Sequence, residues 1–208
     1  MKFTHLLFDL DGTLLDTVTD LANAINYTRN TFKLSPLPES LVATYEGDGI
    51  QKLIERSFKD APQLSLKEAQ EIAGKHYNTH LFDNTKPYPG VIATLRLLPQ
   101  KKAIITNKPA RFLPTLLKKT GLLPFFDVYV GGDTLPNLKP DPRIAYYTME
   151  MMGAKPETTL VIGDHHTDMM LAENAGLKSV FCDYGIGKDG GTLPTFRISF
   201  FNDLINIV

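Results

Sequence analysis

The segment FDLDGT, residues 8–13, closes the first apolar run of the chain, which begins at Phe3. A short apolar run without polar alternation, ended by Asp and Gly, predicts a strand that is covered on both faces, as in a parallel sheet. Because side chains alternate along a strand, Asp9 and Asp11 are expected on the same face. Two neighbouring carboxylates repel each other, so this pair needs a cation or a shared proton.

The rest of the chain alternates between short apolar runs and segments with helical periodicity. The alternation predicts a doubly wound α/β fold, in which helices cover both faces of a parallel sheet. The further strands are expected at residues 103–106, 126–130, 160–162 and 179–182, and the helices at 91–98, 111–120, 143–152 and 168–175.

Residues 16–85 interrupt this alternation. They contain no convincing strand, and their apolar residues recur with helical spacing over residues 50–58, over 66–82, and in a first segment with Leu21, Ile25, Thr28 and Phe32 on one face. About 70 residues exceed an ordinary crossover loop. We therefore expect a small α-helical cap domain at 16–85, inserted into an α/β core of residues 1–15 and 86–208. The segment KPYPG, residues 86–90, is expected to be a stiff return linker.

Composition excludes several classes of protein. The chain has 208 residues, with 22 Lys and Arg against 23 Asp and Glu, and a formal charge of -1. This balance offers no polybasic surface for nucleic acid or an anionic membrane. No signal peptide or apolar run of about 18 residues is recognisable, so a soluble cytoplasmic protein is expected. The single Cys182 excludes an intramolecular disulfide and is expected to be buried.

Polar residues close other predicted strands as well. Thr106 and Asn107 end the second strand, and GDHHTD, residues 163–168, follows the fourth. Lys139 lies between them in LKPDP, residues 138–142, where Asp141 and Pro142 are suited to begin a helix. Ligands bind at the carboxyl ends of strands in doubly wound sheets, so these groups are expected to meet there with Asp9 and Asp11. Carboxylates without paired His or Cys favour Mg²⁺ over zinc.

Such a site suits phosphoryl transfer. A carboxylate can attack phosphorus to form an aspartyl-phosphate, and a second carboxyl can protonate the leaving alkoxide. Mg²⁺ and a lysine would neutralise the oxygens of the transferred group.

The four motifs together resemble the haloacid dehalogenase superfamily and, within it, the phosphoglycolate phosphatase group. They are DLDGT at 9–13, ITN at 105–107, Lys139 before Pro140, and GDHHTD at 163–168. TNKP at 106–109, GGD at 131–133 and KPDP at 139–142 also resemble that group. The resemblance covers nearly the whole chain, including a helical cap after the first motif.

The resemblance implies a role for each matching residue. Asp9 would be the nucleophile and Asp11 the general acid and base, while Thr106, Asn107 and Lys139 would bind the phosphoryl group. Mg²⁺ would be bound by the side chains of Asp9 and Asp164 and by the backbone carbonyl of Asp11, with Thr13 and Asp168 in support. Gly47 and Gly49 match the substrate-specificity loop of the cap, where glycine lets the backbone approach a ligand.

The sequence departs from the group at two places. His165 and His166 follow Asp164 where the group usually has a small polar residue, and they either contact the outer shell of the metal or are polar loop residues. Glu46 and Asp48 place two acids beside an anion site, which argues against 2-phosphoglycolate in particular. Positive charge above the site would then come from Lys52 or Arg56.

The leading hypothesis is therefore a Mg²⁺-dependent phosphatase that acts on a small phosphorylated metabolite, with 2-phosphoglycolate as the first candidate. Other substrates within the same chemistry are a sugar phosphate, a nucleotide or pyrophosphate. A phosphomutase is a second enzyme hypothesis, and a non-catalytic phosphate-binding module is the alternative from another class.

Overall fold

Six parallel strands form the central sheet, in the order β5-β4-β1-β6-β7-β8. The structure is a computed structural model and describes residues 3–208. The strands are β1 (His5–Phe8), β4 (Lys101–Ile105), β5 (Val128–Val130), β6 (Thr159–Gly163), β7 (Lys178–Cys182) and β8 (Phe196–Ile198). β1 lies between β4 and β6, with Leu7 in register with Ala103 on one side and Val161 on the other. The chain thus changes direction across the sheet beside β1, where ligands of doubly wound sheets bind.

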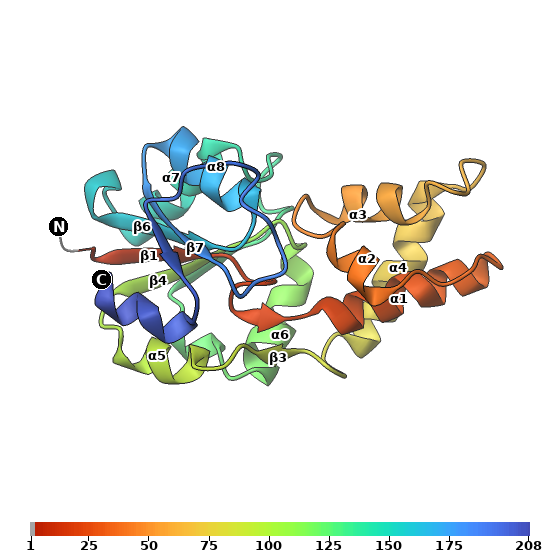
Figure 1. The fold of residues 1–208 in the computed structure, drawn as a ribbon, viewed down its shortest axis with the longest axis horizontal. Coiled ribbons are helices and arrows are strands. Elements are labelled where there is room, and N and C mark those ends of the chain that lie inside the picture. The colour runs from red at the N-terminus through yellow and green to blue at the C-terminus, as the bar shows by residue number, and fades with distance from the viewer. Residues whose placement is uncertain (1–2) are drawn as a thin grey trace.

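Helices cover both faces of this sheet (Figure 1). Leu6 and Phe8 pack in a core cluster that includes residues of α5 (Val91–Leu97), α6 (Leu113–Lys119) and η4 (Phe201–Asn206). Leu7 packs instead with residues of α7 (Pro142–Met152) and α8 (His166–Ala175). The alternation of β1 between two apolar layers explains why its sequence is apolar throughout. The predicted doubly wound α/β fold is confirmed.

All five predicted strands are present, with small shifts at their ends, and Cys182 is buried as expected. Among the short elements that were not predicted are the edge strand β8, the helix α2 (Glu39–Ala43), and a two-stranded antiparallel sheet of β2 (Leu15–Asp16) and β3 (Lys86–Pro87). The return linker therefore begins as a strand, which corrects the expectation of a strand-free junction. Two residues are too few for a periodic pattern to reveal.

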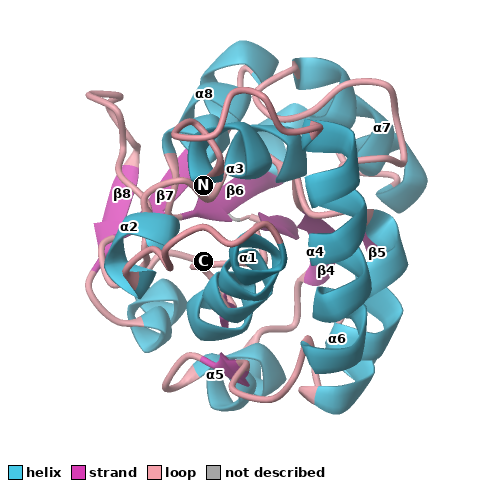
Figure 2. Cartoon of the chain, turned by 90° about the vertical axis from the view of Figure 1, so that its right-hand side faces the viewer, coloured by secondary structure: helices cyan, strands magenta, loops and turns pink. Residues whose placement is uncertain are grey.

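Four helices, α1 (Val18–Thr31), α2, α3 (Ile50–Ser57) and α4 (Leu66–His80), lie between β2 and β3 and are called the helical insertion below. They have an apolar cluster of their own, to which Ile25, Leu53, Phe58 and Ala73 contribute. Figures 1 and 2 show the helical insertion beside the carboxyl ends of the sheet strands. Over residues 3–208, no helix combines the length and the apolarity that a membrane span requires.

Asp20 connects the two ends of the helical insertion. Its carboxylate accepts hydrogen bonds from the backbone N–H groups of Asn84 and Thr85, at 2.8–3.0 Å, and from the side chains of both residues. Burial raises the pKa of Asp20, but these hydrogen bonds outweigh it and leave the pKa below its ordinary value. The start of α1 is thereby fixed to the chain segment that returns to β3.

We expect Asp20→Ala to lower the free energy of unfolding by about 3 kcal/mol, because the donors of Asn84 and of the buried Thr85 lose their acceptor. The lowered pKa means that this stabilisation is complete above about pH 4, the ordinary Asp pKa, and is lost as the pH falls through the lower folded-state value. Urea unfolding of both proteins, from neutral pH toward about pH 3, measures the difference. Asp83→Ala removes an exposed carboxylate nearby and serves as control; an equal loss in both variants would refute the role of Asp20.

Candidate active site

Four aspartates meet at the carboxyl ends of β1 and β6. Asp9 and Asp11 follow β1, while Asp164 and Asp168 lie after β6 and in the first turn of α8. All four are buried, with at most 6% of each residue exposed. The chain therefore brings together the carboxylates that the sequence predicted at one edge of the sheet. Ionised carboxylates at such burial require nearby cations.

Lys139 pairs with two of these carboxylates. Its Nζ lies 2.8 Å from Asp9 Oδ1 and 2.6 Å from Asp168 Oδ1. Burial by itself lowers the pKa of Lys139, but Asp168 and Asp9 raise it above the ordinary lysine value, so the ammonium form persists. The backbone N–H of Lys139 donates to Asn107 Oδ1 at 2.8 Å, and Asp141 caps the following helix. Ion pairs thus fix the ammonium of Lys139, and the bond to Asn107 fixes its backbone.

Asp11 is oriented by two groups, only one of which lies near it in sequence. Its Oδ1 accepts from Thr17 Oγ1 at 2.7 Å and from Lys108 Nζ at 3.0 Å. Lys108 is buried, and its Nζ also lies 4.7 Å from the ring centroid of Tyr77. Burial lowers the pKa of Lys108, but Asp11 raises it above the ordinary value. Lys108 belongs to the TNKP segment, but no role was expected for it, because the sequence does not show that a lysine in a loop is buried.

Asp164 is held by the loop that follows β7. Asp164 Oδ2 accepts from the backbone N–H groups of Ile186, at 3.0 Å, and Gly187, at 2.9 Å, while Oδ1 accepts from Thr13 Oγ1 at 2.8 Å. These bonds join the loop after β7 to the acidic edge of the site. Gly12 has φ +80°, and a Cβ there would lie 2.2 Å from Asp164 Oδ2. Glycine is therefore required where the two loops meet.

The charges at this edge favour a divalent cation. Four carboxylates face two ammonium groups, those of Lys108 and Lys139, which leaves an excess of negative charge. Burial, with repulsion from Asp9 and Asp168, raises the pKa of Asp164 to about 8. Burial, with repulsion from Asp168, raises that of Asp9 to about 6 although Lys139 opposes the shift. Ligand oxygens of Asp9, Asp164 and Asp168 all lie within 4.8 Å of one another, and this oxygen donor set fits a hard ion such as Mg²⁺.

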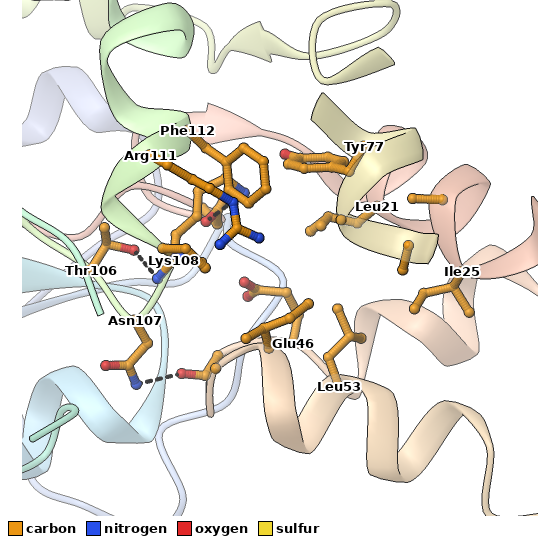
Figure 3. Close-up of a pocket in the computed structure, with 18 of the residues that line it drawn as sticks. Leu21, Ile25, Glu46, Leu53, Tyr77, Thr106, Asn107, Lys108, Arg111 and Phe112 are labelled. Carbon is orange, nitrogen blue, oxygen red and sulfur yellow. Dashed lines mark hydrogen bonds and ion pairs between the residues drawn. The ribbon is translucent and has the colours of Figure 1, made fainter. Parts of the chain in front are cut away.

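A pocket extends from these aspartates to the helical insertion (Figure 3). Thr106, Asn107, Gly47 and Gly49 line it, as the sequence predicted for substrate-binding residues. Asn107 Nδ2 donates to the Gly47 carbonyl at 3.0 Å, so the loop of the helical insertion is bonded to the end of β4. Thr106 Oγ1 accepts from the backbone N–H of Lys108. Tyr77 and Arg111 also line the pocket and were not predicted.

The two histidines contact the helical insertion. His165 Nδ1 caps α8 by accepting from the Thr167 N–H, and a Cβ on Gly47 would lie 2.6 Å from the His165 ring. His166 Nε2 lies 3.4 Å from Asp48 Oδ1. Both histidines therefore lie where the core meets the loop of residues 47–49.

Neither cation that was expected above the site is free to bind there. Arg56 pairs with Asp48, and Lys52 is exposed and pairs with Glu55. The expectation that one of them supplies positive charge to the pocket is therefore wrong. Both lie on α3, and their carboxylate partners also belong to the helical insertion.

The family model, the curated relatives and the solved structures that resemble this chain all indicate the same family. Residues 6–182 match the family model described as haloacid dehalogenase-like hydrolase. The chain is 34% identical to a phosphoglycolate phosphatase of Aquifex aeolicus over 206 residues, 98% of this chain and 95% of the relative. It is 37% identical to one of Neisseria meningitidis, over 92% of this chain and 87% of the relative. A crystal structure of a predicted phosphoglycolate phosphatase from Haemophilus somnus superposes with a TM-score of 0.94 at 30% identity, and covers 100% of this chain and 98% of that one.

We expect Thr13→Val to weaken Mg²⁺ binding by about 10- to 100-fold, because Asp164 loses the hydroxyl that orients its Oδ1. Valine keeps the volume of this fully buried side chain. Calorimetric titration with MgCl₂ measures the change, and Thr31→Val, at an exposed position of α1, is the matched control. An unaltered affinity in folded Thr13→Val would show that this bond does not prepare Asp164 for a metal.

Proposed function

Because this chain belongs to the haloacid dehalogenase-like hydrolases, we propose that it is a Mg²⁺-dependent phosphatase whose substrate is a small phosphomonoester, with 2-phosphoglycolate as the first candidate. The observation that carries this proposal is the buried contact of Asp9 with Lys139 in a pocket that also contains Asp11 and Thr106. The names of the relatives from Aquifex aeolicus and Neisseria meningitidis support the choice of 2-phosphoglycolate.

In the first step, an Asp9 carboxylate oxygen attacks phosphorus as the bond from phosphorus to the ester oxygen breaks. Asp11 donates a proton to the departing alkoxide, which leaves as an alcohol. Lys139 and Thr106 line the pocket beside Asp9, where an ammonium and a hydroxyl stabilise the phosphoryl oxygens. The side chains of Asp9 and Asp164 and the backbone carbonyl of Asp11 would hold Mg²⁺, with Asp168 in support, and the ion would neutralise charge on the phosphoryl group when bound.

In the second step, water attacks the phosphorus of the aspartyl-phosphate, and the bond to the Asp9 oxygen breaks. The carboxylate of Asp11 takes the proton from water, which restores both residues and releases inorganic phosphate. Thr17 and Lys108 fix the orientation of Asp11 for both proton transfers. One residue thus acts as acid in the first step and as base in the second.

We further propose that residues 16–85 act as a cap that closes over the pocket and opens for product release. Two contacts support this role: the hydrogen bond from Asn107 to the Gly47 carbonyl and the packing of Gly47 on His165. Both join the 47–49 loop to the ends of sheet strands. Closure through them would exclude water from the phosphoryl group.

We expect Asp9→Asn to lower kcat by about 10³-fold or more, because the amide cannot attack phosphorus. The measurement is phosphate release from 2-phosphoglycolate and from a panel with a sugar phosphate, a nucleotide and pyrophosphate. Asp83→Asn, at an exposed position, is the matched control. Turnover by Asp9→Asn at the wild-type rate would contradict the covalent mechanism.

Removal of divalent metal with EDTA is expected to stop phosphate release, and added MgCl₂ is expected to restore it, because the buried acids require a counter-ion before a phosphate dianion can enter. The assay is run on the wild-type protein with EDTA, and then with MgCl₂ in excess. Full turnover in EDTA would contradict metal-dependent chemistry.

A further inference from the structure

One of the cations that line the pocket is left unpaired among residues 3–208. The pocket contains three: Lys139, Lys108 and Arg111. The first pairs with Asp9 and Asp168, and the second pairs with Asp11. Within residues 3–208, Arg111 makes no hydrogen bond or ion pair. Its charge is therefore available to a ligand.

Packing positions the guanidinium of Arg111 without using its N–H groups. Its Cζ lies 4.5 Å from the ring centroid of Phe112. Gly74 of α4 packs close to the guanidinium, since a Cβ added to Gly74 would lie only 3.2 Å from Arg111 Nη2. Figure 3 shows the side chain reaching from the core toward the space between Tyr77 and Glu46. Stacking on an aromatic ring orients a guanidinium while its donors stay free.

The wall opposite the aspartates is apolar. Leu21, Ile25 and Leu53 line it from the helical insertion, with Phe112 from the core. Arg111 itself is exposed, so a ligand that enters the pocket can reach its guanidinium. An anion bound at Arg111 would thus gain both a paired charge and a fork of N–H donors.

The size of the pocket limits what reaches Arg111. The cavity has a volume of about 50 Å³, and a water-sized group occupies roughly 10–15 Å³ of such space. A pocket of this size favours a compact leaving group, such as a two-carbon acid, over a sugar ring or a nucleoside.

Resting on the proposed phosphatase function, we propose that Arg111 binds a carboxylate on the leaving group of the substrate and so selects small phosphorylated acids. The phosphoryl end of such a substrate lies at Asp9 and Lys139, and the carboxylate end lies at Arg111. Glu46 and Asp48, the two acids that argued against 2-phosphoglycolate, do not prevent this arrangement. Asp48 is paired with Arg56, and Glu46 has its pKa raised well above the ordinary value by burial and by Asp11 and Asp9, which favours its neutral form.

The test compares two esters of the same size: 2-phosphoglycolate and its uncharged amide, phosphoglycolamide. We expect Arg111→Met to lower the ratio of kcat/KM for the acid to kcat/KM for the amide by about 10- to 100-fold, chiefly through KM. Methionine retains the packing on Phe112 but removes the charge. Arg111→Lys is expected to restore part of the ratio, because it keeps the charge without the fork. Arg96→Met, at an exposed position of α5, is the matched control.

A binding measurement separates this proposal from the proposed function. Calorimetry on Asp9→Asn with MgCl₂ is expected to show tighter binding of the acid than of the amide, and Arg111→Met in that background is expected to remove the difference. That result supports the role of Arg111 even if the wild-type enzyme turns over neither ester, an outcome that would overturn the proposed substrate alone. Equal affinity for both esters before the Arg111 change, or an equal loss for both after it, would overturn the role of Arg111.

Discussion

The Lys139 ammonium, shared between Asp9 and Asp168, is the interaction on which the rest of the site depends. It joins the end of β1 to the first turn of α8, and the Asn107 side chain fixes its backbone to the end of β4. Three strand ends are thus held by one buried cation. A buried carboxylate that loses its cation is strongly destabilised, so the geometry of the site and the stability of the core are not independent. The same pairing that positions Asp9 also prevents mutual repulsion of the acids from opening the sheet edge.

The core and the helical insertion contribute different chemistry to the pocket. Asp9, Asp11, Asp164 and Asp168, and the two lysines that pair with them, belong to the core, whereas Glu46 lines the pocket from the helical insertion. The helical insertion supplies apolar walls at Leu21, Ile25 and Leu53 and a loop whose Gly47 carbonyl bonds to Asn107. This division fits a reaction in which the phosphoryl chemistry is constant and the leaving group determines which residues of the insertion it meets. Arg111 is a core residue that faces the insertion, where it would bind the leaving group without taking part in bond breaking.

Much of this arrangement could be predicted from the sequence, because a change from apolar to polar residues marks where each buried strand ends. An apolar run followed by Asp or Thr locates both the strand and its carboxyl end, and this pattern predicted that Asp9, Asp164 and Thr106 meet at one edge of the sheet. The pattern could not identify Lys108 or Arg111, because their importance depends on their surroundings. Lys108 is buried against Asp11, and the side chain of Arg111 has no polar partner within residues 3–208. Nor could it assign Ile186 and Gly187 to Asp164, because backbone N–H groups have no residue signature. For the same reason Arg56 seemed available until its contact with Asp48 was known.

His165 connects the acidic edge of the sheet to the helical insertion. Its ring caps α8, the helix that contributes Asp168, and its backbone N–H donates to the Asp168 carboxylate at 3.1 Å. The same ring lies so close to Gly47 that no side chain fits there, and Gly47 has φ +102°. A small polar residue in place of His165 would leave space beneath the loop, so histidine here and glycine at 47 are complementary choices. The imidazole thereby transmits the position of α8 to the loop that covers the phosphoryl site, and a displacement of either one must be accommodated by the other.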